Sequence, residues 1–157
     1  MKVAYADPPY LGQSKKHYNN AEINHQELIA ELERYDGWAL SLSSPSLRII
    51  LSMCPIDVRV GSWVKPFCSF KPNVNPAYAW EPVIFKPAQA RGRDKDTVRD
   101  WVADNITLKR GLSGVKPLGF CFWLFEILGM QADDEFVDLF VGSGAVSKAW
   151  QKWRYKF

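Results

Sequence analysis

The sequence predicts one α/β domain with a largely parallel central sheet. Apolar segments typical of strands alternate with segments of helical spacing, and this alternation favours strand–helix–strand units. Two motifs each follow an expected strand directly: Asp7-Pro8-Pro9-Tyr10 follows residues 2–6, and Gly142-Ser143-Gly144 follows residues 135–140. Ligands in open α/β sheets bind at the carboxyl ends of strands, so the two motifs can share one pocket if their strands are adjacent.

In chain order, strands are expected where apolar, β-branched and aromatic residues cluster, over residues 2–6, 37–42, 56–60, 64–70, 80–86 and 135–140. Helices are expected over residues 24–35, 46–53, 97–101, 116–128 and 145–153. Asn24 is the expected N-cap of the first helix. Four prolines between residues 72 and 87 mark an irregular region, which predicts a long hairpin loop over 67–78 at the sheet edge.

The first motif carries residues suited to activating an amine. An exocyclic amine on a nucleobase is a poor nucleophile because its lone pair is delocalised, and a catalyst must pull its N–H bonds out of the ring plane. Asp7 offers a carboxylate acceptor, and the carbonyl of Pro8 offers a second, held in direction because the Pro8-Pro9 pair fixes φ. Tyr10 offers a face on which an extruded base can stack. The alternative is a strand that ends in a proline turn with a tyrosine packed over it.

The second motif predicts a nucleoside site. A glycine turn between a strand and a helix brings backbone N–H groups close to a ligand. Ser147 stands where the dinucleotide pattern G-x-G-x-x-G requires Gly or Ala, so the turn fits one nucleoside better than a pyrophosphate. The two motifs together suggest methyl transfer to an amino group.

With these motifs the chain resembles the amino-group DNA methyltransferases that use S-adenosylmethionine, in the permuted (β-type) order where the catalytic motif precedes the cofactor motif. The resemblance covers most of the chain, and its order is that of small phage-type adenine methylases. Gly114-Val115-Lys116-Pro117 is similar to the lysine-proline motif that approaches the methionine end of the cofactor. The resemblance implies a Rossmann-like methyltransferase domain over 1–157, with a catalytic motif at 3–10, a basic loop at 86–113 and a cofactor motif at 114–153.

The resemblance also implies a reaction, methylation of the exocyclic amine of adenine in double-stranded DNA with the target base flipped out, as in restriction-modification. It assigns the catalytic roles to Asp7, Pro8, Pro9 and Tyr10. It assigns the cofactor contacts to Asp7, Lys116, Pro117, Asp138, Phe140, Gly142, Ser143 and Gly144. No carboxylate follows Asp138, whereas such enzymes continue to an acidic residue that binds the cofactor ribose, so the sheet is expected to be truncated at its cofactor-side edge.

Charge distribution predicts the nucleic-acid contacts. The net charge is only +3, but residues 86–116 hold eight Lys and Arg against four Asp. A basic segment beside a base-flipping pocket is the expected footprint of phosphate contacts. The predicted nucleic-acid-binding residues are Lys15, Lys16, Tyr18, Arg91, Arg93, Lys95, Arg99, Lys109 and Arg110. The alternative is a solvated linker.

The tail over residues 150–157 carries four aromatic residues and three cations, which predicts a homodimer or DNA contact, with ordinary core packing as the alternative. Three cysteines without C-x-x-C spacing predict buried thiols and no metal site. The longest apolar stretch, residues 117–130, is too short to span a bilayer, so we expect a cytoplasmic protein, in the bacterial host cytoplasm if it is phage-encoded.

Two other functions fit the sequence. One is methylation of cytosine amino groups or of RNA. The other is a non-catalytic nucleic-acid-binding protein that kept the motifs and lost cofactor binding.

Overall fold

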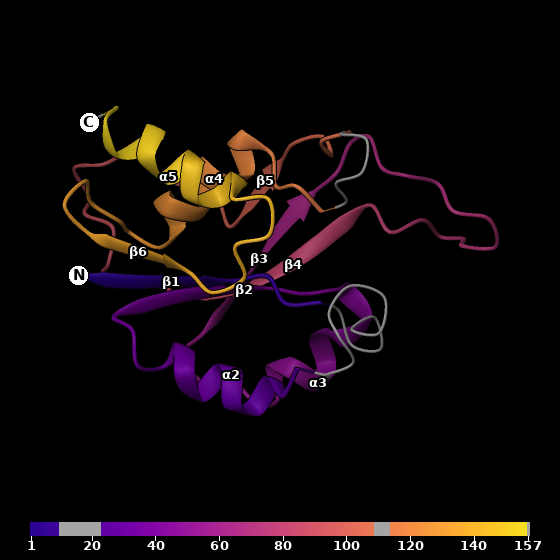
Figure 1. Cartoon of the computed structure of the whole chain (residues 1–157), viewed down its shortest axis with the longest axis horizontal. Coiled ribbons are helices and arrows are strands. Elements are labelled where there is room, and N and C mark those ends of the chain that lie inside the picture. The colour runs from indigo at the N-terminus through magenta and orange to yellow at the C-terminus, as the bar shows by residue number, and fades with distance from the viewer. Residues whose placement is uncertain (10–22, 109–113, 157) are drawn as a thin grey trace.

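The computed structural model describes residues 1–9, 23–108 and 114–156 (Figure 1). Its strands are β1 (Lys2–Ala6), β2 (Gly37–Ser41), β3 (Arg59–Val64), β4 (Trp80–Lys86), β5 (Trp101–Ala103) and β6 (Glu135–Asp138). Its helices are α2 (His25–Leu32), the 3-10 turn η1 (Ser44–Ser46), α3 (Leu47–Leu51), α4 (Leu118–Ile127) and α5 (Ala145–Arg154).

The described strands form one sheet in the order β5-β3-β4-β2-β1-β6. Strand β1 is parallel to both of its neighbours, β2 and β6, and β3 is parallel to β5. Only β4, between β2 and β3, is antiparallel to its neighbours. The predicted α/β fold with a mostly parallel sheet is confirmed.

Helices cover both faces of the sheet, with α4 and α5 on one face and α2 and α3 on the other (Figure 1). Alternate residues of β1 divide between these layers: Val3 and Tyr5 belong to the core under α4 and α5, while Ala4 and Ala6 belong to the core with α2. This alternation follows from the period of two in a strand. Both faces are therefore apolar, and polar chemistry is left to the ends of the strands.

The helices predicted over residues 24–35 and 145–153 are present as α2 and α5. The side chain of Asn24 accepts hydrogen bonds from the backbone N–H groups of Gln26 and Glu27, as predicted for an N-cap. In α5, Trp150 and Trp153 are buried and contact Phe125 of α4, with ring centroids 5.3 and 5.8 Å apart. These two aromatic residues of the tail are core residues, which is the alternative that the sequence left open.

Three local expectations were wrong. A single strand, β3, replaces the two expected over 56–60 and 64–70. The helix expected over 97–101 is absent, because the carbonyl of Asp100 accepts from Ser62 N at 2.9 Å and the carbonyl of Arg99 accepts from Trp123 Nε1. The backbone of this segment therefore makes its hydrogen bonds with β3 and α4 rather than within a helical turn. The long hairpin loop is present, but β5 lies outside β3, so the hairpin is not at the sheet edge.

The strand directions give the sheet two distinct ends. At the carboxyl end, β1, β2, β3, β5 and β6 finish and β4 begins. At the amino end, these five strands begin and β4 finishes. Helices α4 and α5 return over the sheet, so their first residues lie at the carboxyl end.

Candidate active site at the carboxyl end of the sheet

The two sequence motifs lie on neighbouring strands. Tyr5 of β1 is in register with Asp138 of β6, and the backbone N–H of Leu139 donates to the carbonyl of Tyr5 at 2.9 Å. Asp7 therefore emerges beside the chain that leads into the Gly142 turn. The adjacency on which a shared pocket depends is confirmed.

The glycine turn has a backbone that glycine accommodates best. Gly142 and Gly144 have φ values of 49° and 71°, in the left-handed region. A Cβ atom at Gly142 would meet nothing closer than the carbonyl oxygen of Phe140, at 3.8 Å. The requirement at Gly142 is thus conformational, and the space beside the turn is open.

Asp138 holds the turn in place. Its Oδ1 accepts from the backbone N–H of Phe140 at 3.2 Å, and its Oδ2 accepts from Ser147 Oγ at 3.5 Å. Burial raises the pKa of the Asp138 carboxyl, and these two hydrogen bonds oppose the rise. Asp138, the last residue of β6, is therefore hydrogen-bonded both to the start of the turn at Phe140 and to Ser147 of α5.

Asp7 is ion-paired at the entrance to α4. Its Oδ2 lies 3.2 Å from Nζ of Lys116, whose side chain is only 4% exposed, while that of Asp7 is 24% exposed. Pro117 follows at the N-cap of α4 and is buried. The structure thus joins the first residue of the catalytic motif to the lysine of the predicted cofactor motif.

Two residues that the sequence analysis missed complete this cluster. Glu81 of β4 lies 2.5 Å from Lys116 Nζ through Oε1 and 3.1 Å from Lys65 Nζ through Oε2, and its side chain is 3% exposed. The ring of Trp63 lies 4.5 Å from the Lys65 ammonium and 5.2 Å from that of Lys116. One signal could have indicated Glu81, since it is the only charged residue in the apolar run of residues 80–85.

The cluster Asp7–Lys116–Glu81–Lys65 is here called the charge chain. Its carboxylates and ammonium groups alternate, and their formal charges sum to zero. Burial raises the pKa of the Asp7 carboxyl, the Lys116 ammonium opposes that rise, and the Glu81 carboxylate adds to it. Beside the chain, burial raises the pKa of the Tyr5 hydroxyl well above its usual range, and this hydroxyl is hydrogen-bonded to Ser41 Oγ at 2.8 Å. Tyr5 is therefore a buried, neutral residue next to the charge chain.

The remaining predicted residues are distributed as follows. Pro8 is buried, Pro9 and Phe140 are partly buried, and Ser143 is exposed in the glycine turn. Tyr10, Lys15, Lys16, Tyr18, Lys109 and Arg110 lie outside the described residues. The structure therefore brings Asp7, Pro8, Pro9, Lys116 and the glycine turn to one end of the sheet.

The described part of the basic segment lies at the other end. Strand β4 is antiparallel, so the chain leaves Lys86 at the amino end, and Arg91, Arg93, Lys95 and Arg99 all precede the start of β5 there. The expected position beside the base pocket is wrong for these residues. Their phosphate contacts stay a prediction.

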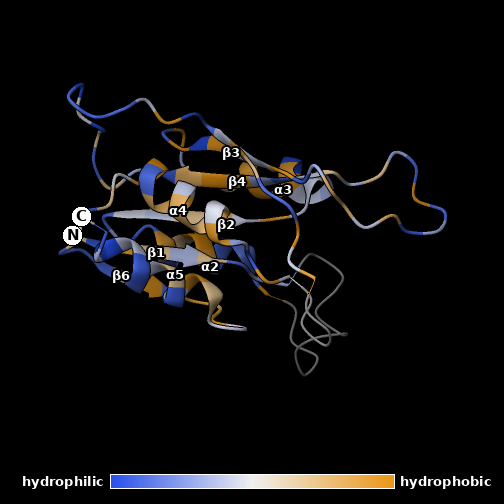
Figure 2. Ribbon diagram, turned by 90° about the horizontal axis from the view of Figure 1, so that it is seen from above, coloured by the Kyte–Doolittle hydropathy of each residue, from blue (hydrophilic) through white to orange (hydrophobic). Residues whose placement is uncertain are grey.

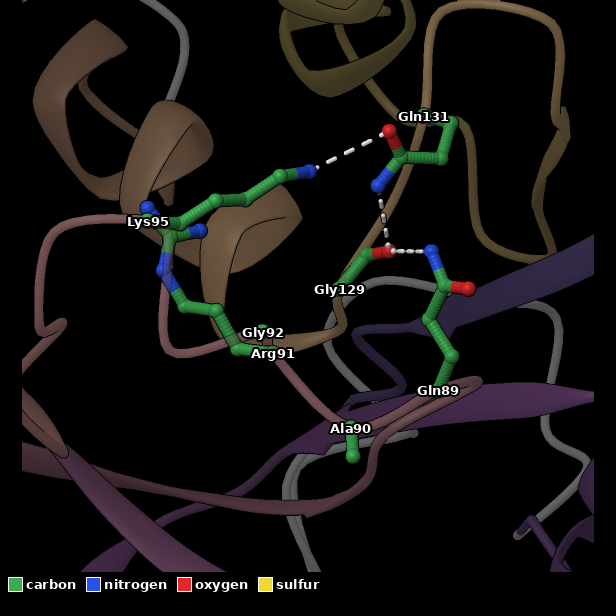
Figure 3. Close-up of a pocket in the computed structure, with 7 residues that line it drawn as sticks. All are labelled: Gln89, Ala90, Arg91, Gly92, Lys95, Gly129 and Gln131. Carbon is green, nitrogen blue, oxygen red and sulfur yellow. Dashed lines mark hydrogen bonds between the residues drawn. The ribbon is translucent and has the colours of Figure 1, made fainter.

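Two of these residues, Arg91 and Lys95, line a separate hollow at the amino end (Figure 3). Arg91 is ion-paired with Glu126, and Lys95 Nζ donates to Oε1 of Gln131 at 3.2 Å. Gln89 closes another side by donating to the carbonyl of Gly129 at 2.8 Å (Figure 3). Part of the positive charge in this segment is therefore used within the protein.

Over the described ranges, no group of three or more His, Cys, Asp or Glu side chains has the arrangement of a metal site. Within the same ranges, no helix has the length and apolar character needed to cross a membrane. Cys68 and Cys121 are buried and Cys54 is partly buried, and burial raises the pKa of the Cys121 thiol to about 12.

The sheet order and the helices on its two faces define a Rossmann-like α/β fold. In particular, two solved structures share it: the M1.HpyAVI-SAM complex, with a TM-score of 0.65 and 17% identity, and M1.HpyAVI, with a TM-score of 0.62 and 16% identity. The superposition covers 98% of this chain in each case, and 78% and 77% of the two structures. No family model and no curated protein matches the sequence.

Proposed function

We propose that the protein transfers a methyl group from S-adenosylmethionine to the exocyclic amino group of adenine in DNA. The observation that carries this proposal is the pairing of β1 with β6, which sets Asp7-Pro8-Pro9 beside the glycine turn at one end of the sheet. The fold shared with the M1.HpyAVI-SAM complex supports the same cofactor.

The residues present fit the cofactor. Among the described residues, a Cβ atom at Gly142 would meet nothing nearer than 3.8 Å, and glycine itself has no side chain, so the turn backbone can approach a nucleoside closely. Phe140, Gly142, Ser143 and Gly144 would hold the nucleoside, while Asp7, Lys116 and Pro117 border the methionine end. When bound, the cofactor supplies a methyl group on a positively charged sulfur.

The charge chain prepares the other reactant. The Asp7 carboxylate accepts one N–H of the target amine and the carbonyl of Pro8 accepts the other, which turns the nitrogen lone pair toward the methyl group. After methylation the nitrogen would have to lose a proton, which Asp7 is placed to accept. Because burial raises the pKa of Asp7, its carboxylate is a better acceptor for that proton than an exposed aspartate.

The proposal has further parts. The chain order, with the Asp7 motif before the glycine turn, corresponds to the permuted arrangement of a small phage-type enzyme. The substrate is double-stranded DNA with the base flipped out, in restriction-modification and in the host cytoplasm. A homodimer is proposed, with exposed residues of the tail in contact.

The direct test is incubation of the purified protein with unmethylated DNA and methyl-labelled cofactor, followed by nucleoside analysis. We expect label in N6-methyladenine, and none when Asp7 is replaced by Ala. Label in cytosine or in RNA alone would replace adenine as the substrate. Binding of DNA without label in any base would favour the non-catalytic alternative.

A further inference from the structure

The connection between β3 and β4, residues 65–79, projects from the carboxyl end of the sheet in both views (Figures 1 and 2). Together with Trp80, the first residue of β4, it is here called the aromatic arm (residues 65–80). Four aromatic side chains on it are exposed: Phe67 by 53%, Phe70 by 81%, Tyr78 by 57% and Trp80 by 42%. Grouped exposed rings on a soluble protein mark a binding surface, because they leave a large apolar area in water.

The base of the arm is fixed. Lys65 N donates to the carbonyl of Ala79 at 2.8 Å and extends the β3–β4 ladder by one step. The backbone N–H of Phe67 donates to Asn105 Oδ1 at 3.0 Å, and Cys68 is 7% exposed. The arm is therefore attached at its base, and its four rings remain exposed.

The chemistry of the arm fits nucleic acid. Residues 65–80 contain no Asp or Glu and two lysines, of which Lys71 is exposed. Exposed rings beside an exposed cation suit unstacked bases and phosphates, because every base has a π face and every phosphate is negative. An apolar partner surface would not need Lys71, and an acidic protein would not need four rings.

The arm also begins at the candidate active site. Lys65 is the last member of the charge chain, joined through Glu81 and Lys116 to Asp7 by contacts of 3.1, 2.5 and 3.2 Å. A nucleic acid that delivers a base to Asp7 would pass beside the first residues of the arm.

We propose that the aromatic arm docks the DNA substrate by stacking on bases next to the flipped target, with Lys71 on a phosphate. This inference rests on the proposed function, since it states how the same site engages its DNA. Stacking tolerates any sequence, so the arm contributes affinity and positioning rather than base selectivity.

The test compares Phe70→Ala/Tyr78→Ala with Ile56→Ala. Ile56 is a fully exposed apolar residue just before β3, so it lies at the amino end of the sheet, away from the end that carries Asp7. The probe is a labelled duplex with one unpaired adenine, measured by fluorescence anisotropy without cofactor. We expect the dissociation constant of the double variant to rise by at least ~10-fold, as for lost base stacking, and that of Ile56→Ala to stay within about twofold.

Lys71→Gln gives a second readout. The slope of log affinity against log salt should fall by about one unit in magnitude, the signature of one lost phosphate contact. Unchanged affinity in the double variant would overturn the arm as a docking element. Altered sedimentation with unchanged DNA affinity would also overturn it and make the surface a protein interface.

The binding assay also separates the two proposals. If the parent protein transfers no methyl group but the arm variants lose DNA affinity, the proposed reaction fails and the arm stands. If methyl transfer occurs and the double variant retains both affinity and rate, the arm fails alone.

Discussion

At the scale of single residues, the charge chain places opposite charges in alternation within a largely buried cluster. Removing one member of a buried pair is costly because the partner charge is left uncompensated. Lys116 is ion-paired both with Asp7, which follows β1, and with Glu81 of β4, so it couples the catalytic motif to the centre of the sheet. The same arrangement makes the pKa of Asp7 sensitive to Glu81, because the negative charge of Glu81 raises that pKa while both carboxylates pair with Lys116.

Asp7→Ala should lower the rate of methyl transfer by at least ~10³-fold, the size of effect seen when a preorganised polar group is removed from a transition-state site. Cofactor affinity measured by calorimetry should change little. Asp133→Ala is the matched control, because this aspartate is exposed and lies at the amino end. A rate within tenfold of the parent would remove Asp7 from the catalytic role.

The pH dependence of the rate follows from the raised pKa of Asp7. The carboxylate form is the active one, so activity is lost as the pH falls through the pKa of the folded protein. Since burial raises this pKa, the acid limb of kcat/KM should lie above the ordinary Asp value of about 3.9. Glu81→Gln removes a negative charge that contributes to the rise, and we expect the limb to move to lower pH.

A pH profile of Glu81→Gln that coincides with the parent would contradict the electrostatic coupling. Stability gives an independent readout in the same variant. Breaking the buried pair should cost ~3–5 kcal/mol in urea unfolding, because Lys116 loses one of two carboxylates. Exposed Glu135→Gln, whose ion pair with Lys2 is in solvent, serves as the control.

Sequence alone could indicate Asp7 and the glycine turn because each motif is contiguous and follows its own strand. Glu81 and Lys65 could not be assigned in the same way. Their contacts depend on β4 being inserted between β2 and β3, and that order is a property of the whole sheet. A buried acid in an apolar strand indicates a partner but does not identify it.

At the scale of elements, the turn after β6 works through its backbone. Gly142→Val should weaken cofactor binding at least ~10-fold, because a β-branched residue is strained at φ near 49°. Gly142→Asn should retain much more affinity, since asparagine enters the left-handed region far more readily. Calorimetry on both variants distinguishes conformation from bulk, and equal loss in both would contradict a conformational cause.

Element prediction failed where strand pairing outweighed local preference. The carbonyls of Arg99 and Asp100 accept from Trp123 Nε1 and Ser62 N rather than from a helical turn, and β5 then begins at Trp101. The strand β4, by contrast, was predicted to the residue, and Pro87 follows directly after its last residue.

At the scale of the whole molecule, α4 and α5 pack together through aromatic rings. Trp153 is 5% exposed and stacks on Trp150 with centroids 5.4 Å apart. Trp153→Ala should therefore lower the free energy of unfolding by ~3–5 kcal/mol in urea titration. Tyr155→Ala, at an exposed ring of the same tail, should change it by less than ~0.5 kcal/mol.

The proposed homodimer is tested in the same pair of proteins. Tyr155→Ala should weaken self-association in sedimentation if the exposed tail forms the contact. A sedimentation profile identical to that of the parent would leave the tail with a packing role only.

The reversed direction of β4 separates two regions that are close in sequence. Seven residues of strand carry the chain from the aromatic arm to residues 87–100, a span of roughly 24 Å. The effects of substitutions at the carboxyl end and at the amino end on the free energies of unfolding and of binding should therefore be additive. A fluorophore or peptide tag attached near Gly92 would lie at the amino end of the sheet and leave the candidate active site undisturbed. Residues 92–96 are therefore a practical attachment point for single-molecule measurements.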